Sequence, residues 1–147
     1  MTSPTVELSH AFGFDAAHRF DSFPDGHPNR RMHGHSFQVE VAVRGTPDPA
    51  TGFVMELSQL EAACGALRSA LDHHVLNEIA GLEQPSLERL SVWIWDQLAG
   101  GVARLARVTV RRDSRGQSCT YRGPCQPGGG CRAASNAAPA AAPAAIS

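Results

Sequence analysis

The sequence predicts a single α+β domain in which two helices cover one face of a four-stranded antiparallel sheet. Three observations predict it: two alternating apolar stretches near the N-terminus, two stretches with helical spacing in the middle, and two short strand-like stretches after them. A run of strands, then helices, then strands, in the order β-β-α-α-β-β, indicates an antiparallel sheet with its helices on one side. The 147 residues suffice for one such core.

The first two strands are predicted from their period of two. Apolar residues at even positions from Val6 to Ala16 mark the first strand, and His18 continues it on the same face. In the second strand, apolar residues occupy the odd positions from Phe37 to Val43. Residues 45–52 are rich in Gly and Pro, so a turn follows the second strand.

Two amphipathic helices are predicted next. The apolar residues of the first helix recur at spacings of three and four: Leu57, Leu60, Cys64, Leu67 and Leu71. Ser58 followed by Glu61 predicts a capping box at its start. The second helix is expected to begin near Pro85 and Ser86, to end at Gly100, and to bury Leu87, Leu90, Ile94 and Leu98.

The remaining strands and the C-terminus complete the prediction. Val108 and Val110 mark a third strand, and residues 119–122 form a short fourth strand after a polar turn at 113–117. Gly, Pro and Ala dominate from there on, with almost nothing to bury. We therefore expect a folded domain of residues 1–123 and a disordered tail of residues 124–147.

Three histidines, His18, His33 and His35, are predicted to bind a metal ion. His33 and His35 are two residues apart at the start of a strand and therefore share a face, and His18 approaches them if the two strands pair. Three imidazoles leave the fourth position of a tetrahedral Zn²⁺ open, which is typical of catalytic zinc. The alternative is three ordinary surface or core histidines. We favour the metal site because the third histidine lies on the neighbouring strand.

The overall composition argues against some partners. The formal net charge is −1 and no basic stripe is present, so we expect no nucleic-acid partner. The N-terminus lacks a signal-peptide pattern and no apolar stretch approaches membrane length. We therefore expect a cytoplasmic protein that does not associate with membranes.

Six segments resemble the 6-pyruvoyltetrahydropterin synthase and 6-carboxytetrahydropterin synthase family, and the bacterial 6-carboxytetrahydropterin synthase branch looks closest. They are FDAAHR (14–19), MHGHSF (32–37), LDHHVLN (71–77), GLE (81–83), WIWDQ (93–97) and YRG (121–123). The resemblance extends from about residue 8 to residue 123. It implies the tunnelling fold, or T-fold, in which the sheets of several subunits join into a barrel, usually in a homo-hexamer made of two trimers.

The resemblance also implies a zinc-dependent lyase of pterin or 7-deazapurine biosynthesis. His18, His33 and His35 would hold Zn²⁺ in a pocket between subunits. The small-molecule substrate would be 7,8-dihydroneopterin triphosphate or a related pterin, whose side chain is rearranged or shortened with loss of triphosphate. Zinc would polarise the side-chain oxygens and acidify the neighbouring C–H bonds. Asp72 and His73 match the family's acid–base pair.

The chain departs from the family at two positions that touch substrate. Asn29 occupies the slot of the catalytic cysteine, and an amide is no base at neutral pH. The nearby His27 is a hypothesis for the missing base; an exposed loop histidine is the alternative. Arg112 occupies the slot of the glutamate that accepts hydrogen bonds from the pterin edge, and Asp113 reaches the pocket only through a bulge. A guanidinium only donates, so Arg112 suits an anionic or carbonyl-bearing ligand.

Three functional hypotheses follow from these residues. The first is a zinc-dependent lyase on a pterin, and the breadth of the resemblance favours it. The second keeps the zinc site but uses a different, anionic substrate in specialised metabolism, and the changes at Asn29 and Arg112 favour it. The third is a non-catalytic oligomer that binds zinc or another ligand.

Overall fold

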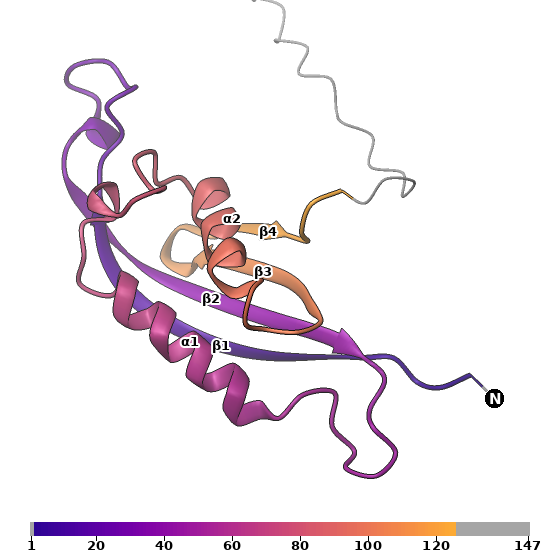
Figure 1. Cartoon of the computed structure of the whole chain (residues 1–147). Coiled ribbons are helices and arrows are strands. Elements are labelled where there is room, and N and C mark those ends of the chain that lie inside the picture. Colours follow the sequence, from indigo (N-terminus) through magenta and orange to yellow (C-terminus); the bar gives the residue numbers. More distant parts are fainter. Residues whose placement is uncertain (1, 126–147) are drawn as a thin grey trace, which may run out of the picture.

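One four-stranded sheet forms the centre of the computed structural model, which describes residues 2–125 (Figure 1). The strands follow one another in space as in sequence, each antiparallel to the next: β1 (Val6–His18), β2 (His33–Gly45), β3 (Leu105–Arg112) and β4 (Gln117–Tyr121). Two α-helices, α1 (Leu57–Leu71) and α2 (Leu87–Leu98), separate the two strand pairs. The predicted α+β class and element order are confirmed. The predicted disordered tail, 124–147, lies outside the described residues except for its first two.

Short 3-10 helices fill three of the connections. They are η1 (Pro28–Arg30) between β1 and β2, η2 (Leu76–Glu78) between α1 and α2, and η3 (Asp113–Arg115) in the turn from β3 to β4. Within residues 2–125, neither α1 nor α2 has the length and apolar character that crossing a bilayer requires.

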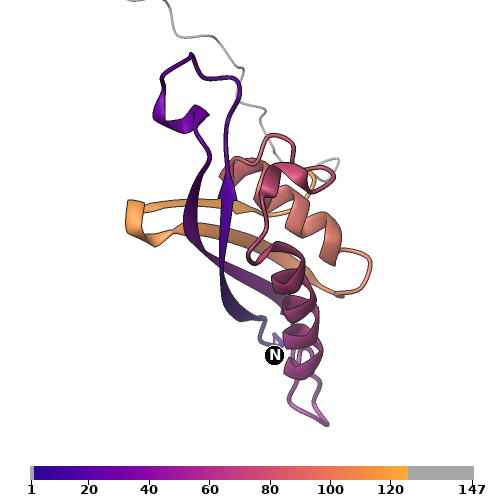
Figure 2. The same ribbon diagram turned by 90° about the vertical axis from the view of Figure 1, so that its left-hand side faces the viewer.

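Both helices lie on the same side of the sheet (Figure 2). Helix α1 packs mainly on β1, and α2 packs on β3 and β4. The opposite face bears small and polar side chains, because the residues between the buried positions of each strand point there. On that face Arg107 forms ion pairs with Glu7 and Glu40. The sheet therefore has one apolar, helix-covered face and one polar face that no element of the chain covers.

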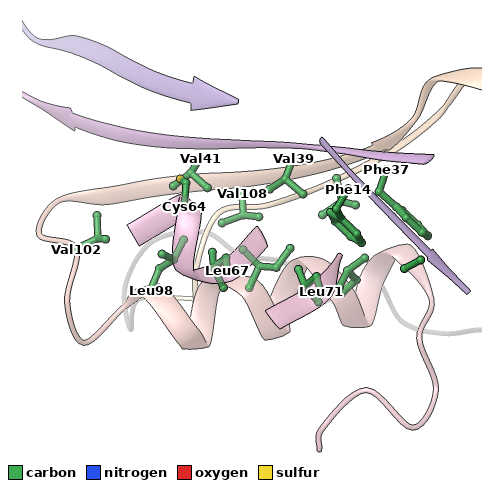
Figure 3. Close-up of a cluster of buried hydrophobic side chains, with 14 of the residues drawn as sticks. Phe14, Phe37, Val39, Val41, Cys64, Leu67, Leu71, Leu98, Val102 and Val108 are labelled. Carbon is green, nitrogen blue, oxygen red and sulfur yellow. The ribbon is translucent and has the colours of Figure 1, made fainter. Parts of the chain in front are cut away.

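The core lies between the sheet and the helices (Figure 3). Its sheet layer consists of the alternating residues that the period of two predicts, and Val39, Val41 and Val108 are at most 1% exposed. The helix layer consists of the predicted stripes, including Leu67, Leu71 and Leu98. Burial of these side chains is the dominant stabilising contribution to such a fold.

The start of each helix tests the predicted capping residues. Ser86 is the N-cap of α2, which begins where the sequence predicted, and its hydroxyl oxygen accepts a hydrogen bond from the Arg89 amide at 3.1 Å. The capping box at Ser58 is wrong. Helix α1 begins at Leu57, two residues before the start that an N-cap at Ser58 predicts. Its N-cap, Glu56, makes no side-chain hydrogen bond, and Ser58 lies inside the first turn.

The pairing register of β1 and β2 positions the histidines. Phe14 lies opposite Phe37, and their rings stack with centroids 5.0 Å apart. The same register places His18 opposite His33 and Ala16 opposite His35. A slip of one residue would turn one set of side chains to the uncovered face. Burial of the phenylalanines therefore fixes the position of the three imidazoles.

Leu71→Ala should destabilise the protein by about 2–5 kcal/mol, because Leu71 is fully buried at the end of α1. Leu57, the first residue of the same helix, is 43% exposed, so Leu57→Ala should cost less than about 1 kcal/mol. Urea unfolding of both variants measures the difference. Equal losses would contradict the packing described for α1.

Candidate metal and acid–base site

The side chains of His18, His33 and His35 meet on the helix-covered face. Their ring centroids are 4.6 Å (His18 to His33), 5.1 Å (His18 to His35) and 5.0 Å (His33 to His35) apart. One ligand nitrogen from each ring lies within 4.8 Å of the others. His18 is 1% exposed. The fold thus brings together all three residues that the sequence suggested as metal ligands.

Backbone carbonyls set the tautomers of two of these rings. His18 Nδ1 lies 3.2 Å from the Pro85 carbonyl oxygen, and His33 Nδ1 lies 2.7 Å from the Arg31 carbonyl oxygen. A carbonyl oxygen only accepts, so Nδ1 carries the proton of each neutral ring and Nε2 keeps a free lone pair. The two Nε2 atoms face each other at 3.1 Å. Nitrogens on a tetrahedral Zn²⁺ are about 3.3 Å apart, so this donor set fits a zinc ion.

The protonation of the site also favours metal binding. Burial lowers the pKa of His18 to about 4; the hydrogen bond to Pro85 opposes this shift, and the positive charges of His33, His35 and Arg112 add to it. Burial, followed by the charge of Arg112, also lowers the pKa of His35. Both rings are therefore neutral at neutral pH, which is the form that binds a metal ion.

Two residues that the sequence did not single out hold His18 in place. The Pro85 carbonyl orients the His18 ring, as described above. Asn77 fixes the backbone next to it: its side-chain oxygen accepts from the Arg19 amide at 3.0 Å, and its side-chain nitrogen donates to the Arg19 carbonyl at 2.9 Å. Asn77 lies in the LDHHVLN segment, but neither contact has a sequence signature of its own.

Asp72 and His73 form a hydrogen-bonded pair at the end of α1. Asp72 Oδ2 lies 3.0 Å from His73 Nδ1 and 3.3 Å from an Arg68 guanidinium nitrogen, and its Oδ1 accepts from the Asp15 amide at 2.9 Å. The Asp15 hydrogen bond, together with His73 and Arg68, keeps the pKa of Asp72 below its usual value. His73 has a left-handed backbone (φ 58°), which is strained for a residue with a side chain. Its side chain is 80% exposed.

A hollow of about 480 Å³ links the pair to the histidine cluster, because both His73 and His35 line it. Asp15 and Ser36 also line it, and the Ser36 hydroxyl donates to Asp15 Oδ1 at 2.5 Å. The hollow is open to solvent in the single chain. Its lining thus includes one member of the histidine cluster, His35, and one member of the Asp–His pair, His73.

His27 and Asn29 lie together in the loop between β1 and β2. His27 caps η1, its Nδ1 accepts from the Asn29 amide at 3.1 Å, and its ring stacks on Phe23 at 4.2 Å. The Phe20 ring connects this group to the cluster, with its centroid 6.1 Å from Phe23 and 4.8 Å from His18. His27 is therefore two aromatic rings away from His18.

Arg112 and Asp113 are separated by the sheet. Arg112 Nη1 lies 3.4 Å from His35 Nε2, so its side chain reaches the cluster. Asp113 starts η3, and its carboxylate pairs with Arg111 at 3.0 Å. Arg111 and Arg112 are adjacent in β3 and point to opposite faces. The predicted contact of Arg112 with the site has geometric support, whereas the Asp113 carboxylate is directed to a partner elsewhere.

Fold and site together define a T-fold protein with a three-histidine cluster and an Asp–His pair. The chain belongs to the 6-pyruvoyl tetrahydropterin synthase family, whose model matches residues 7–124. It is 39% identical to a 6-carboxy-5,6,7,8-tetrahydropterin synthase of Synechocystis over 105 residues, which cover 67% of this chain and 80% of the relative. It is 31% identical to a dihydroneopterin monophosphate aldolase of Pyrococcus furiosus over 102 residues, which cover 66% of this chain and 81% of the relative.

A solved structure shares the fold. The 6-pyruvoyl tetrahydropterin synthase of Caenorhabditis elegans superposes with a TM-score of 0.75 at 24% identity, covering 84% of this chain and all of the other. The predicted T-fold is confirmed.

The metal-free protein should lose stability as the pH falls. The unfolded state binds a proton at His18 near pH 6.5, whereas the folded state resists protonation down to about pH 4. The unfolded state therefore holds more protons between these values, and the free energy of unfolding should fall by about 3 kcal/mol as the pH drops from 6.5 to 4. Urea unfolding across this range measures it. His18→Gln should flatten the dependence.

Proposed function

We propose that this protein is a cytoplasmic, zinc-dependent lyase that acts on 7,8-dihydroneopterin triphosphate or a related pterin. The observation that carries the proposal is the pair of unprotonated Nε2 atoms of His18 and His33, 3.1 Å apart, with His35 beside them. His73, which pairs with Asp72 and lines the same hollow as His35, supports an enzyme rather than a storage site. The names of the Synechocystis and Pyrococcus relatives both refer to pterins, which supports the substrate class.

The residues divide the chemistry between them. Zn²⁺ held by His18, His33 and His35 supplies a Lewis acid that polarises substrate oxygens. His73 is the proposed base: its Nδ1 proton is directed to Asp72, so Nε2 is the nitrogen that accepts a proton from the substrate. The ionised Asp72 then stabilises the imidazolium that forms.

His27 is the proposed replacement for the cysteine whose slot Asn29 occupies. Its Nδ1 accepts a hydrogen bond from the Asn29 amide, so the neutral ring carries its proton on Nε2. In this form Nε2 donates a hydrogen bond, and a neutral imidazole does not give up its proton at neutral pH. We therefore propose that His73 takes the proton and returns it, and that His27 orients a substrate oxygen through Nε2, with Asn29 holding the His27 ring.

A homo-oligomer, as a hexamer of two trimers, is the proposed assembly. The strands at the two edges of the sheet, β1 and β4, present backbone N–H and C=O groups with which another strand could pair. Within residues 2–125, no helix packs on the polar face of the sheet (Figure 2). A neighbouring subunit would cover the exposed His73 and enclose the open hollow. Light scattering on the full chain measures the subunit number, and a monomer would contradict this assembly.

Triphosphate release tests the activity directly. Zinc-loaded protein incubated with 7,8-dihydroneopterin triphosphate should release inorganic triphosphate, and chelator-treated protein should not. Release that is independent of zinc, or no release with full zinc occupancy, would contradict the proposed reaction.

Asp72→Asn should lower kcat about 10²- to 10⁴-fold, because an amide neither fixes the His73 tautomer nor stabilises its imidazolium. Zinc content should stay at one ion per chain, since Asp72 is outside the histidine cluster. Asp96→Asn makes the same chemical change on the exposed side of α2 and serves as the control. A variant with half or more of the original kcat would remove Asp72 from the mechanism.

A second candidate function is the same zinc chemistry on a different, anionic substrate. One observation favours it: the Arg112 guanidinium, which only donates, lies beside His35 where the family resemblance places a hydrogen-bond-accepting glutamate. If this candidate is correct, Asn29→Cys combined with Arg112→Glu should raise turnover of 7,8-dihydroneopterin triphosphate at least tenfold. The single variants are the controls, and an unchanged rate would count against a change of substrate at these two positions.

A further inference from the structure

Arg112 is held at the histidine cluster with most of its hydrogen-bonding capacity unused. It follows Val108 and Val110 at alternate positions of β3, both fully buried, so its side chain enters the helix-covered face. Its Nε atom is buried and, within residues 2–125, has no hydrogen-bond partner. Its Nη1 atom contacts His35 Nε2 at 3.4 Å, a long distance for a hydrogen bond.

No carboxylate in the described part of the chain lies within 4.0 Å of this guanidinium. Its neighbour Arg111 pairs with Asp113, and Arg107 pairs with Glu7 and Glu40, all on the opposite face. A half-buried charge without a partner is costly, and proteins usually pair such a group. Here the guanidinium faces the histidine cluster, where the proposed function places the substrate.

The local field is positive as well. Burial lowers the pKa of Arg112, the nearby charge of Arg115 lowers it further, and Glu88 acts in the opposite direction. Arg115 also acts on His35. Two guanidinium groups and a divalent cation at the histidines would together attract a negatively charged group.

Metal binding at the histidines would remove the hydrogen-bond acceptor of Arg112. A guanidinium has no acceptor, so His35 Nε2 is the acceptor in the contact with Arg112. If a metal ion takes that lone pair, the Arg112 donor loses the one acceptor that it has within residues 2–125. The planar fork of donors is then available to two oxygens of one ligand group.

We propose that Arg112 binds a carboxylate or phosphate group of the substrate next to the metal position. The inference takes the location of the reaction site from the proposed function. It adds the chemical group of the substrate, a carboxylate or a phosphate, that the site selects. Arg112 is thus a specificity-determining residue. A ligand that is neutral at this point leaves the half-buried guanidinium without a partner, which favours a negatively charged ligand.

The test compares two ligands that differ only at this group. Pterin-6-carboxylate and the neutral 6-hydroxymethylpterin are titrated into the zinc-loaded full chain, and binding is followed by pterin fluorescence. We expect wild type to bind the carboxylate at least tenfold more tightly. Arg112→Gln should reduce this preference at least tenfold, and Arg111→Gln, on the opposite face, should leave it within twofold. An unchanged preference in Arg112→Gln with full zinc would overturn the proposal.

Zinc content and thermal melting check each variant. If Arg112→Gln fails to fold or to hold zinc, Arg112→Lys replaces it, because lysine keeps the charge and lacks the fork. We then expect at least threefold weaker binding of the carboxylate, and no weakening would overturn the proposal.

Competition with inorganic phosphate and with acetate identifies the anion. Stronger competition by one of them, lost in Arg112→Gln, assigns phosphate or carboxylate. If neither pterin binds but either anion still binds in a way that depends on Arg112, the inference stands and the pterin substrate fails. If both pterins bind equally and neither anion needs Arg112, the inference fails and the pterin substrate stands.

Discussion

The pairing register between β1 and β2 is the constraint on which the rest of the structure depends. Stacking of Phe14 on Phe37 in the core holds the two strands in a single alignment, and the same alignment sets His18 against His33. The packing that stabilises the domain therefore also determines the geometry of the cluster. A sheet with one buried face specifies its register strongly, because any slip exposes the apolar side chains. The core sets the position of the site, and the loop carbonyls of Pro85 and Arg31 orient two of its rings.

Sequence alone predicted the features that depend on local periodicity. The alternation of β1 and β2 indicated that the three histidines share a face, and the stripes located both helices. Contacts made by backbone carbonyls were not predictable, and the Pro85 carbonyl on His18 is the clearest case. The capping box of α1 was wrong, because the helix begins at Leu57 with Glu56 as its N-cap and Ser58 lies within the first turn. The approach of Arg112 to His35 depends on the way three strands align, so its distance was not available from spacing.

The chain combines the fold of its family with departures from the family resemblance at Asn29 and Arg112. The three histidines meet in one cluster, and Asp72 and His73 form a hydrogen-bonded pair. Under the proposed function, the differences at Asn29 and Arg112 would alter contacts with the substrate. Substrate specificity can change in this way while the chemistry is kept. The residues that hold the metal and transfer the proton stay in place, and only the residues that contact the variable group of the substrate differ.

X-ray absorption at the zinc edge tests the central claim most directly, because it reports the ligands of the ion in the intact protein. The zinc-loaded full chain should bind one equivalent of zinc that survives dialysis, with about three nitrogen ligands and one further light atom at about 2.0–2.1 Å. Sulfur at about 2.3 Å, a six-oxygen shell, or zinc that dialyses away would contradict a site made by His18, His33 and His35.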